Sequence, residues 1–199
     1  MSDMTGRRSA HSKELEMSQL RSFAPWIAYP AASALFGWQA GAAVALGFCI
    51  IGLACDGRAA ATTDTLRMAA LVFFAALSAV AYADPATALH QYVPALIPAT
   101  LAVTAAVSIL VARPFTVTFA KRVAPREFWD TPLFVHINMV LTGVWATSFA
   151  ITAAIIAITL TVAPHAFGIL LGVQVAGFVV PMRITRWYPA KARARYALA

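Results

Sequence analysis

The feature that most constrains the fold of this chain is the length of its segments without a charged side chain. Four segments contain no Asp, Glu, Lys or Arg, and they cover residues 22–55, 68–83, 85–112 and 131–182. A helix needs about 20 apolar residues to cross the roughly 30 Å hydrocarbon core of a bilayer. The last segment has 52 residues, so it predicts two crossings rather than one.

The composition agrees with a membrane location. Hydrophobic residues make up 61% of the 199 residues and charged residues 12%, whereas a soluble domain has about 45–50% and about 25%. A soluble domain needs more polar residues to cover its surface, and a disordered chain is poor in apolar residues. The composition therefore excludes both classes and predicts an integral membrane protein.

Two of the uncharged segments need an internal break. Pro164 provides one, because proline does not continue a helix and disfavours helical geometry in the residue before it, so we expect a corner at 163–165. Gly37 and Gly41 flank an interfacial tryptophan and provide the other. The predicted fold class is all-α, a polytopic membrane protein with six transmembrane helices in three hairpins. The expected spans are 23–36, 39–55, 68–83, 90–112, 133–158 and 165–182.

The basic residues predict the orientation of these spans. All 15 Lys and Arg residues lie before the first span, between the second and third, between the fourth and fifth, or after the sixth. Cytoplasmic loops retain Lys and Arg, so both termini are predicted to be cytoplasmic and the number of spans to be even. A single span over 22–55 would translocate Arg58 and Arg67, which favours a hairpin there, with a re-entrant segment as the alternative. Asp84 is then the one charged side chain outside.

These patterns divide the chain into three parts. A polar cytoplasmic N-terminal tail covers 1–21, the six-helix membrane domain covers 22–182, and a basic cytoplasmic C-terminal tail covers 183–199. The expected location is the bacterial cytoplasmic (inner) membrane.

The connection between the fourth and fifth spans, 113–132, is the most distinctive segment. If it is helical after Pro114, then Phe115, Phe119 and Val123 form one apolar stripe with basic residues beside it. A helix of this kind lies in the headgroup plane, with its apolar face towards the acyl chains and its cations near anionic phosphates. The sequence therefore predicts an amphipathic cytoplasmic elbow here.

The end of this connection contains the start signal of the fifth span. Either Asp130 or Thr131 caps that helix, and Pro132 occupies its first position, where a missing N–H costs nothing. Two interpretations of the connection stay open: a structural anchor for the fifth span, and a docking site for a lipid headgroup or a protein partner. The contacts expected here and in the C-terminal tail are Arg113, Phe115, Phe119, Lys121, Arg122, Arg126, Trp129, Arg183 and Arg186.

A family resemblance rests on the same connection. The motif Arg-Pro-Phe-Thr at 113–116 is followed by a basic pair at 121–122, by Pro125 and Trp129, and by a span with Asn138, Trp145 and Phe149. This arrangement distantly resembles the intracellular septation protein A family of small bacterial inner-membrane proteins, over about residues 22–55 and 113–150. The resemblance implies a polytopic cytoplasmic-membrane protein associated with cell-envelope synthesis, elongation or division. It implies action through protein contacts and no catalytic residues.

Polar side chains inside the spans are the next candidates, because they are costly in lipid and usually face the interior of a bundle. Asn138, Thr142 and Trp145 are four and three residues apart, so they share one face of the fifth span, and Gln174 lies near the middle of the sixth. These residues either bond neighbouring helices or line a substrate cavity. Both interpretations stay open.

The cavity interpretation leads to an alternative function. Ala24, Ala28 and Ala32 form a ladder of small residues on the first span, in a chain of about 200 residues with both ends inside. This is similar to the substrate-binding subunits of energy-coupling-factor vitamin transporters. The alternative is therefore a small-molecule, vitamin-like transport subunit with a substrate cavity inside the helix bundle.

Several motifs are absent from the sequence. No Asp or Glu lies within any expected span, which disfavours a carboxylate proton relay. The sequence has no phosphate-binding glycine loop, no His-Glu-x-x-His motif and no acidic cluster for Mg²⁺. His90 and His165 begin two spans at the membrane interface, too shallow for the usual haem ligands of membrane cytochromes. We expect no enzyme, no metal and no cofactor.

The strong positive charge predicts lipid contact. The C-terminal tail has five cations and no acid, and each cation near an anionic leaflet contributes on the order of 1 kcal/mol. Nucleic-acid binding is not expected, because the chain has no folded basic domain. The expected partners are the lipid bilayer with its anionic inner leaflet and other membrane proteins.

Overall fold

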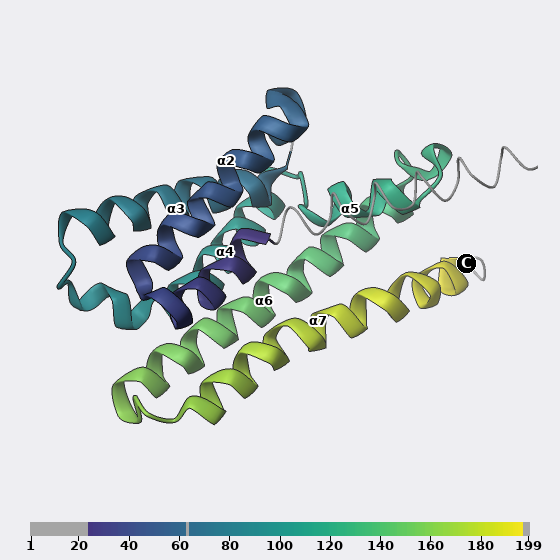
Figure 1. Ribbon diagram of the computed structural model, residues 1–199. Helices are drawn as coiled ribbons and strands as arrows, with labels where there is room; N and C mark the ends of the chain where they lie inside the picture. The colour runs from purple at the N-terminus through teal and green to yellow at the C-terminus, as the bar shows by residue number, and fades with distance from the viewer. Residues whose placement is uncertain (1–23, 63, 197–199) are drawn as a thin grey trace, which may run out of the picture. The chain divides into compact units, whose positions relative to one another are not determined.

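The computed structural model describes residues 24–62 and 64–196. The predicted N-terminal tail, 1–21, and the last three residues of the predicted C-terminal tail lie outside the described residues. All regular structure in the described part is helical, as predicted (Figure 1). The chain divides into two compact units, one ending at Thr87 and the other beginning at Ala88.

The first unit turns sharply at a glycine. It contains a helix over 24–36, α2 (Trp38–Thr62) and α3 (Thr65–Ala83). Gly37 lies between the first two with a φ of +86°, a left-handed conformation that glycine adopts without strain. A Cβ atom on Gly41 would lie 2.8 Å from the Cβ of Ser33 and 3.0 Å from the backbone oxygen of Tyr29. The chain thus folds back on itself at the predicted break.

An aromatic cluster forms the core of this unit. The ring of Trp26 stacks on Phe73 with centroids 5.7 Å apart and contacts Phe74 at 5.1 Å. Tyr29 contacts Phe74 at 5.9 Å, and Trp26, Tyr29 and Phe74 are buried. Such aromatic pairs stabilise packing beyond the area that they bury, so this cluster fixes the helix over 24–36 against α3.

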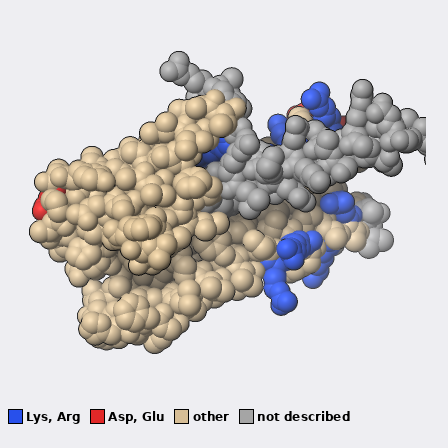
Figure 2. Space-filling model, viewed as in Figure 1, with Lys and Arg blue, Asp and Glu red and all other residues tan. Residues whose placement is uncertain are grey.

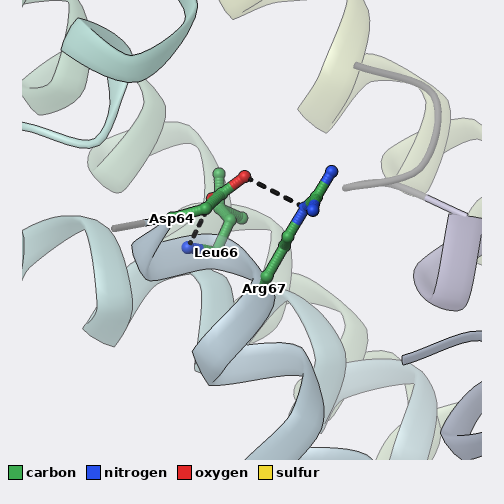
Figure 3. Close-up of polar contacts among 3 residues, drawn as sticks. All are labelled: Asp64, Leu66 and Arg67. Carbon is green, nitrogen blue, oxygen red and sulfur yellow. Dashed lines mark hydrogen bonds and ion pairs between the residues drawn. The ribbon is translucent and has the colours of Figure 1, made fainter. Parts of the chain in front are cut away.

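Asp64 begins α3. Its carboxylate accepts a hydrogen bond from the backbone N–H of Leu66 at 3.2 Å and lies 3.3 Å from Nε of Arg67 (Figure 3). An aspartate at this position satisfies a free N–H of the first turn and interacts favourably with the helix dipole, for about 1 kcal/mol. The start of α3 is therefore determined locally.

The second unit is arranged around one long helix. It contains η1 (Ala88–Tyr92), α4 (Val93–Leu110), α5 (Thr116–Val123), η2 (Arg126–Phe128), α6 (Pro132–Val162) and α7 (Phe167–Tyr196). α6 packs against both α4 and α7, and α5 contacts α6 as well. The chain reverses after α6 at the predicted corner, so α7 runs antiparallel to α6 (Figure 1).

A proline in α7 determines how α7 meets α6. Pro181 lies inside the helix and has no N–H, so the carbonyl oxygen of Gly177 lacks its usual partner. Ser148 of α6 donates a hydrogen bond to that oxygen at 2.9 Å. A Cβ atom on Gly177 would collide with the side chain of Thr152. The missing donor, the close approach and the serine together fix the register of the two helices.

Within 24–62 and 64–196, five helices are long and apolar enough to cross a membrane, which indicates a multi-pass membrane protein. The stretches that meet this description are Trp38–Cys55, Thr65–Ala83, Ala88–Leu110, Pro132–Val162 and Phe167–Ala194. The helix over 24–36 is described over thirteen residues, which reach roughly 20 Å at 1.5 Å per residue. The predicted first span, 23–36, and with it the count of six, therefore stays a prediction.

Two helices continue beyond the expected ends of their spans. α2 extends past 55 to Thr62, and α7 extends past 182 to Tyr196, so most of the predicted C-terminal tail is helical. Alanine, arginine and lysine have high helix propensity, and both extensions are rich in them. The first charged residue after each uncharged segment thus does not end the helix.

Replacing Ser148 with alanine should lower the free energy of unfolding by about 1 kcal/mol, because the oxygen of Gly177 loses its donor in apolar surroundings. In a Pro181→Ala background the backbone N–H of residue 181 is restored and bonds the same oxygen. The cost of Ser148→Ala should then fall to less than half. Unfolding of the four proteins in detergent micelles by added dodecyl sulfate measures both costs, and equal costs would contradict this account.

Candidate functional site

The segment between α4 and α6, residues 111–131, is called the elbow below. It begins with a tight turn in which Ala112 has a φ of +54°. The backbone N–H of Arg113 donates to the backbone oxygen of Ser108 at 2.9 Å, and the backbone N–H of Ala112 donates to the backbone oxygen of Ile109 at 2.9 Å. This Schellman pattern usually has glycine in the left-handed position, so Ala112 has a strain of roughly 1 kcal/mol. The turn sends the chain out of α4 and directly into α5.

A buried polar cluster attaches the start of α5 to α4 and α6. Its members are Ser108, Thr116, Asn138 and Thr142, and all four are buried. The hydroxyl of Thr116 donates to the backbone oxygen of Asn138 at 2.9 Å and lies 2.8 Å from the hydroxyl of Thr142. A hydroxyl has one proton to donate, so Thr142 is the donor in the second bond. Ser108 accepts a bond from the N–H of Phe115 at 3.2 Å.

Among the described residues, only the nitrogen of the Asn138 side-chain amide has a hydrogen-bond partner. Its Nδ2 donates to the backbone oxygen of Phe134 at 2.8 Å. Its Oδ1 is buried, and within the described residues it has no hydrogen-bond partner. A buried acceptor without a donor costs free energy, so the Oδ1 of Asn138 is an unfavourable group in this cluster.

The structure brings only two of the four predicted lining residues together. Asn138 and Thr142 belong to the polar cluster at the elbow. Trp145 lies further along the same buried face of α6, where its Nε1 donates to the hydroxyl of Thr185 in α7 at 3.0 Å. Gln174 lies half-buried on α7. Asn138, Thr142 and Trp145 therefore all form contacts between helices or with the elbow.

A groove of about 650 Å³ opens between α6 and α7. Small and aliphatic side chains form most of its walls, together with the hydroxyl side chains of Thr147, Ser148 and Thr152. Ser148 already bonds to α7, and Thr152 packs against Gly177. None of the four predicted lining residues is on its walls. The walls of the groove therefore resemble an apolar contact surface between two helices.

The surface of the elbow presents two cations on one aromatic ring. Lys121 Nζ lies 4.9 Å from the ring centroid of Trp129, and the guanidinium carbon of Arg126 lies 5.6 Å from it. The Nε1 of Trp129 donates to the backbone oxygen of Ala124 at 3.0 Å, which fixes the ring. Both distances are in the range of a cation–π interaction. Lys121 and Arg126 are exposed, whereas Trp129 is half-buried.

The other predicted contacts on the elbow differ in their exposure. Arg113 is exposed, while Phe119 and Arg122 are half-buried, with the guanidinium carbon of Arg122 5.5 Å from the Phe119 ring. Phe115 is only 7% exposed, and its contact with lipid or a partner stays a prediction. Its N–H bonds to Ser108, and its ring packs edge-on against Phe119 at 6.3 Å. The apolar stripe of α5 therefore starts in the interior and reaches the surface at Val123, which is 78% exposed.

The last part of α7 has a second group of cations. Arg183 and Arg186 are exposed, and Lys191 Nζ lies 5.2 Å from the ring centroid of Trp187. Figure 2 shows Lys and Arg side chains along this end of α7. Because α6 and α7 are antiparallel, the cations of α7 and those of the elbow lie at the same end of the second unit (Figure 1).

Sequence reasoning missed Ser108 and the role of Thr116. Thr116 is part of the Arg-Pro-Phe-Thr motif, but its partner Thr142 is 26 residues away, and helical periodicity does not predict a contact between two helices. The cap of α6 was left open between two residues, and the structure assigns it to Thr131, which accepts from the N–H of Phe134 at 3.3 Å. In the described part of the chain, no group of three His, Cys, Asp or Glu residues is placed to hold a metal ion.

Replacing Thr116 with valine should release the elbow from α6. The hydroxyl of Thr142 and the carbonyl of Asn138 lose their partner while the volume of the side chain is kept, so we expect a loss of about 1–2 kcal/mol. Trypsin should then cleave after Lys121 faster than in the wild type. Thr118→Val, on the half-buried part of the same helix, should change both properties little. Equal cleavage of the two variants in detergent would contradict the role of Thr116.

Comparison of the chain with protein-family models, with curated proteins and with solved structures finds no match. The elbow and the buried face of α6 are therefore interpreted from their own geometry.

Proposed function

We propose that this chain is a six-span, non-catalytic protein of the bacterial cytoplasmic membrane, associated with cell-envelope synthesis or division, and that it acts through protein and lipid contacts. One observation carries the proposal: the polar side chains of α6 attach the elbow and α7, while Lys121 and Arg126 stay exposed on a fixed ring. A protein that acts by contact needs a rigid surface with a defined charge. The elbow is such a surface.

In this proposal the helix over 24–36 is the first of six spans, and both termini are cytoplasmic. The cations of the second unit support this orientation, because they all lie in the elbow or in the last part of α7. The opposite end of the unit, at 88–92 and 163–166, has no charged residue in its sequence. Cytoplasmic segments retain Lys and Arg, so the end with the elbow is the cytoplasmic one. An even number of spans then requires the segment 24–36 to cross.

The resemblance to the intracellular septation protein A family supports the envelope or division role. Part of the motif that carries the resemblance belongs to the elbow. Residues 113–116 lead into α5, the basic pair Lys121 and Arg122 lies on α5, and Trp129 lies just before α6. Phe115 and Thr116 of the motif are buried and attach the elbow, while its exposed cations Arg113 and Lys121 lie on the surface through which such a protein would act.

The alternative, a vitamin-like transport subunit, has less support. It needs polar side chains that line a substrate cavity. Asn138 and Thr142 are engaged in the polar cluster, and Trp145 bonds to Thr185. The side chains of Thr142 and Trp145 are thus used for contacts with the elbow and α7, and that of Asn138 bonds within α6, so we place the contact function first.

Purification of the full-length tagged chain from its native membrane in mild detergent tests the proposal. We expect envelope-synthesis or division proteins to be recovered with the wild type, because a fixed elbow presents the contact surface. Asn138→Leu should recover them equally, since the side-chain amide of Asn138 bonds only to its own helix, at the backbone oxygen of Phe134, and its Oδ1 has no partner among the described residues. Thr116→Val, which releases the elbow, should recover fewer. Identification by mass spectrometry, relative to an unrelated tagged membrane protein, gives the measurement.

Two results of this experiment would contradict the proposal. Recovery of an ATPase module together with a bound metabolite would support the transport alternative instead. Recovery of the chain alone would contradict a function that depends on protein contacts.

A further inference from the structure

Two cations converge on one fixed indole ring at the elbow. The distances of 4.9 Å and 5.6 Å from the Trp129 centroid mean that Lys121 Nζ and the guanidinium carbon of Arg126 are at most about 10.5 Å apart. The bond from Trp129 Nε1 to Ala124 holds the ring in place. Two positive charges held beside one ring give the elbow a local excess of positive charge, which favours a ligand with negative charge.

No carboxylate of the described residues neutralises this pair. Glu127 and Asp130 are the acidic residues of the elbow and are exposed. In the part of the chain that the structure describes, neither of them forms an ion pair with Lys121 or Arg126. The pair therefore has positive charge available for a ligand from outside the chain.

The length of α6 places this pair at the level of lipid headgroups. Its 31 residues span about 46 Å at 1.5 Å per residue, and a bilayer with both headgroup layers is about 40–45 Å thick. Trp129 lies three residues before Pro132, at one end of this helix. Tryptophan is typical of the membrane–water interface, where its ring is apolar and its N–H is polar.

Exposed apolar side chains beside the cations favour lipid over an acidic protein surface or free phosphate. Val123 ends α5 and is 78% exposed, and Phe128 next to Trp129 is 49% exposed. Cations together with exposed apolar side chains are typical of segments that bind at the headgroup and acyl boundary. A soluble anion would give no partner to Val123 and Phe128.

We propose that Lys121, Arg126 and Trp129 form a binding site for the headgroup phosphate of an anionic phospholipid. The two cations bind the phosphate oxygens with charge-assisted hydrogen bonds, and Trp129 holds both cations in place beforehand. A zwitterionic headgroup binds less well, because its ammonium group brings positive charge next to the pair. The site rests on the proposed function only in taking α6 to cross the membrane.

Titration of the purified full chain with phosphatidylglycerol or phosphatidylcholine tests the site, with bound lipid counted by native mass spectrometry. The wild type should bind phosphatidylglycerol more tightly than phosphatidylcholine. The double variant K121Q/R126Q should lose this preference, with an affinity about 30-fold lower, since each cation near an anionic surface contributes roughly fivefold. The matched control K191Q/R193Q removes two cations at the same end of the unit, one of them also over a tryptophan. It should lower the affinity less than about fivefold.

A second variant separates a built site from simple charge attraction. Trp129→Ala keeps every charge of the elbow but removes the ring that positions the two cations, so its affinity for phosphatidylglycerol should fall by about fivefold. All variants are compared with the wild type for helix content by circular dichroism. Equal losses in the two double variants, an unchanged affinity of Trp129→Ala, or no preference for phosphatidylglycerol in the wild type would each overturn the site. Displacement of the lipid by inorganic phosphate at equal concentration would do so too, because it would identify a free anion as the ligand.

The outcome of this lipid titration does not depend on whether the envelope or division role is correct. Lipid binding is measured on the isolated chain and needs no protein partner, so a negative result leaves the envelope proposal standing. Recovery of the chain without protein partners would likewise leave the lipid site standing. If K121Q/R126Q kept its lipid affinity but lost a co-purified protein, the pair would bind an acidic protein surface, and the lipid site would be wrong.

Discussion

The second unit depends on the rule that a polar group removed from water must find its partner inside the protein. Pro181 leaves the oxygen of Gly177 without a donor, and Ser148 supplies one from the neighbouring helix. The same rule applies at the elbow, where the hydroxyl of Thr116 bonds to the backbone oxygen of Asn138 and to the hydroxyl of Thr142. Each of these bonds joins two helices, so the need to satisfy polar groups in an apolar environment also determines how α6 meets α7 and α5.

The attachment of the elbow separates the roles of its residues. Phe115 and Thr116 lie in the interior and position α5, whereas Lys121 and Arg126 lie on the surface and share the Trp129 ring. Interior hydrogen bonds thus give the surface cations a fixed arrangement that a mobile loop would lack. This division is what makes the elbow suited to recognition of lipid or protein, and it supports a function by contact over a function by reaction.

Much of the helical architecture follows from the sequence, because it depends on local rules. Uncharged segments long enough to cross a bilayer, the turn at Gly37 and the proline at the start of α6 all predict where helices begin and end. The charges of 183–195 did not predict that α7 continues to Tyr196, since a charged residue does not by itself end a helix. The burial of Phe115 and the bond between Thr116 and Thr142 were not predictable either. They depend on the packing of separate helices, which periodicity within one helix does not determine.

The central claim is that six spans place the elbow and the connection between α2 and α3 on the cytoplasmic side. Single cysteines at Ala60, Asp84 and Glu127, in a chain with Cys49 and Cys55 replaced by alanine, test it with a thiol reagent that does not cross membranes. In intact cells the account predicts labelling at position 84 alone, with positions 60 and 127 labelled only after the membrane is permeabilised. Labelling of position 60 or 127 from outside intact cells would contradict the account.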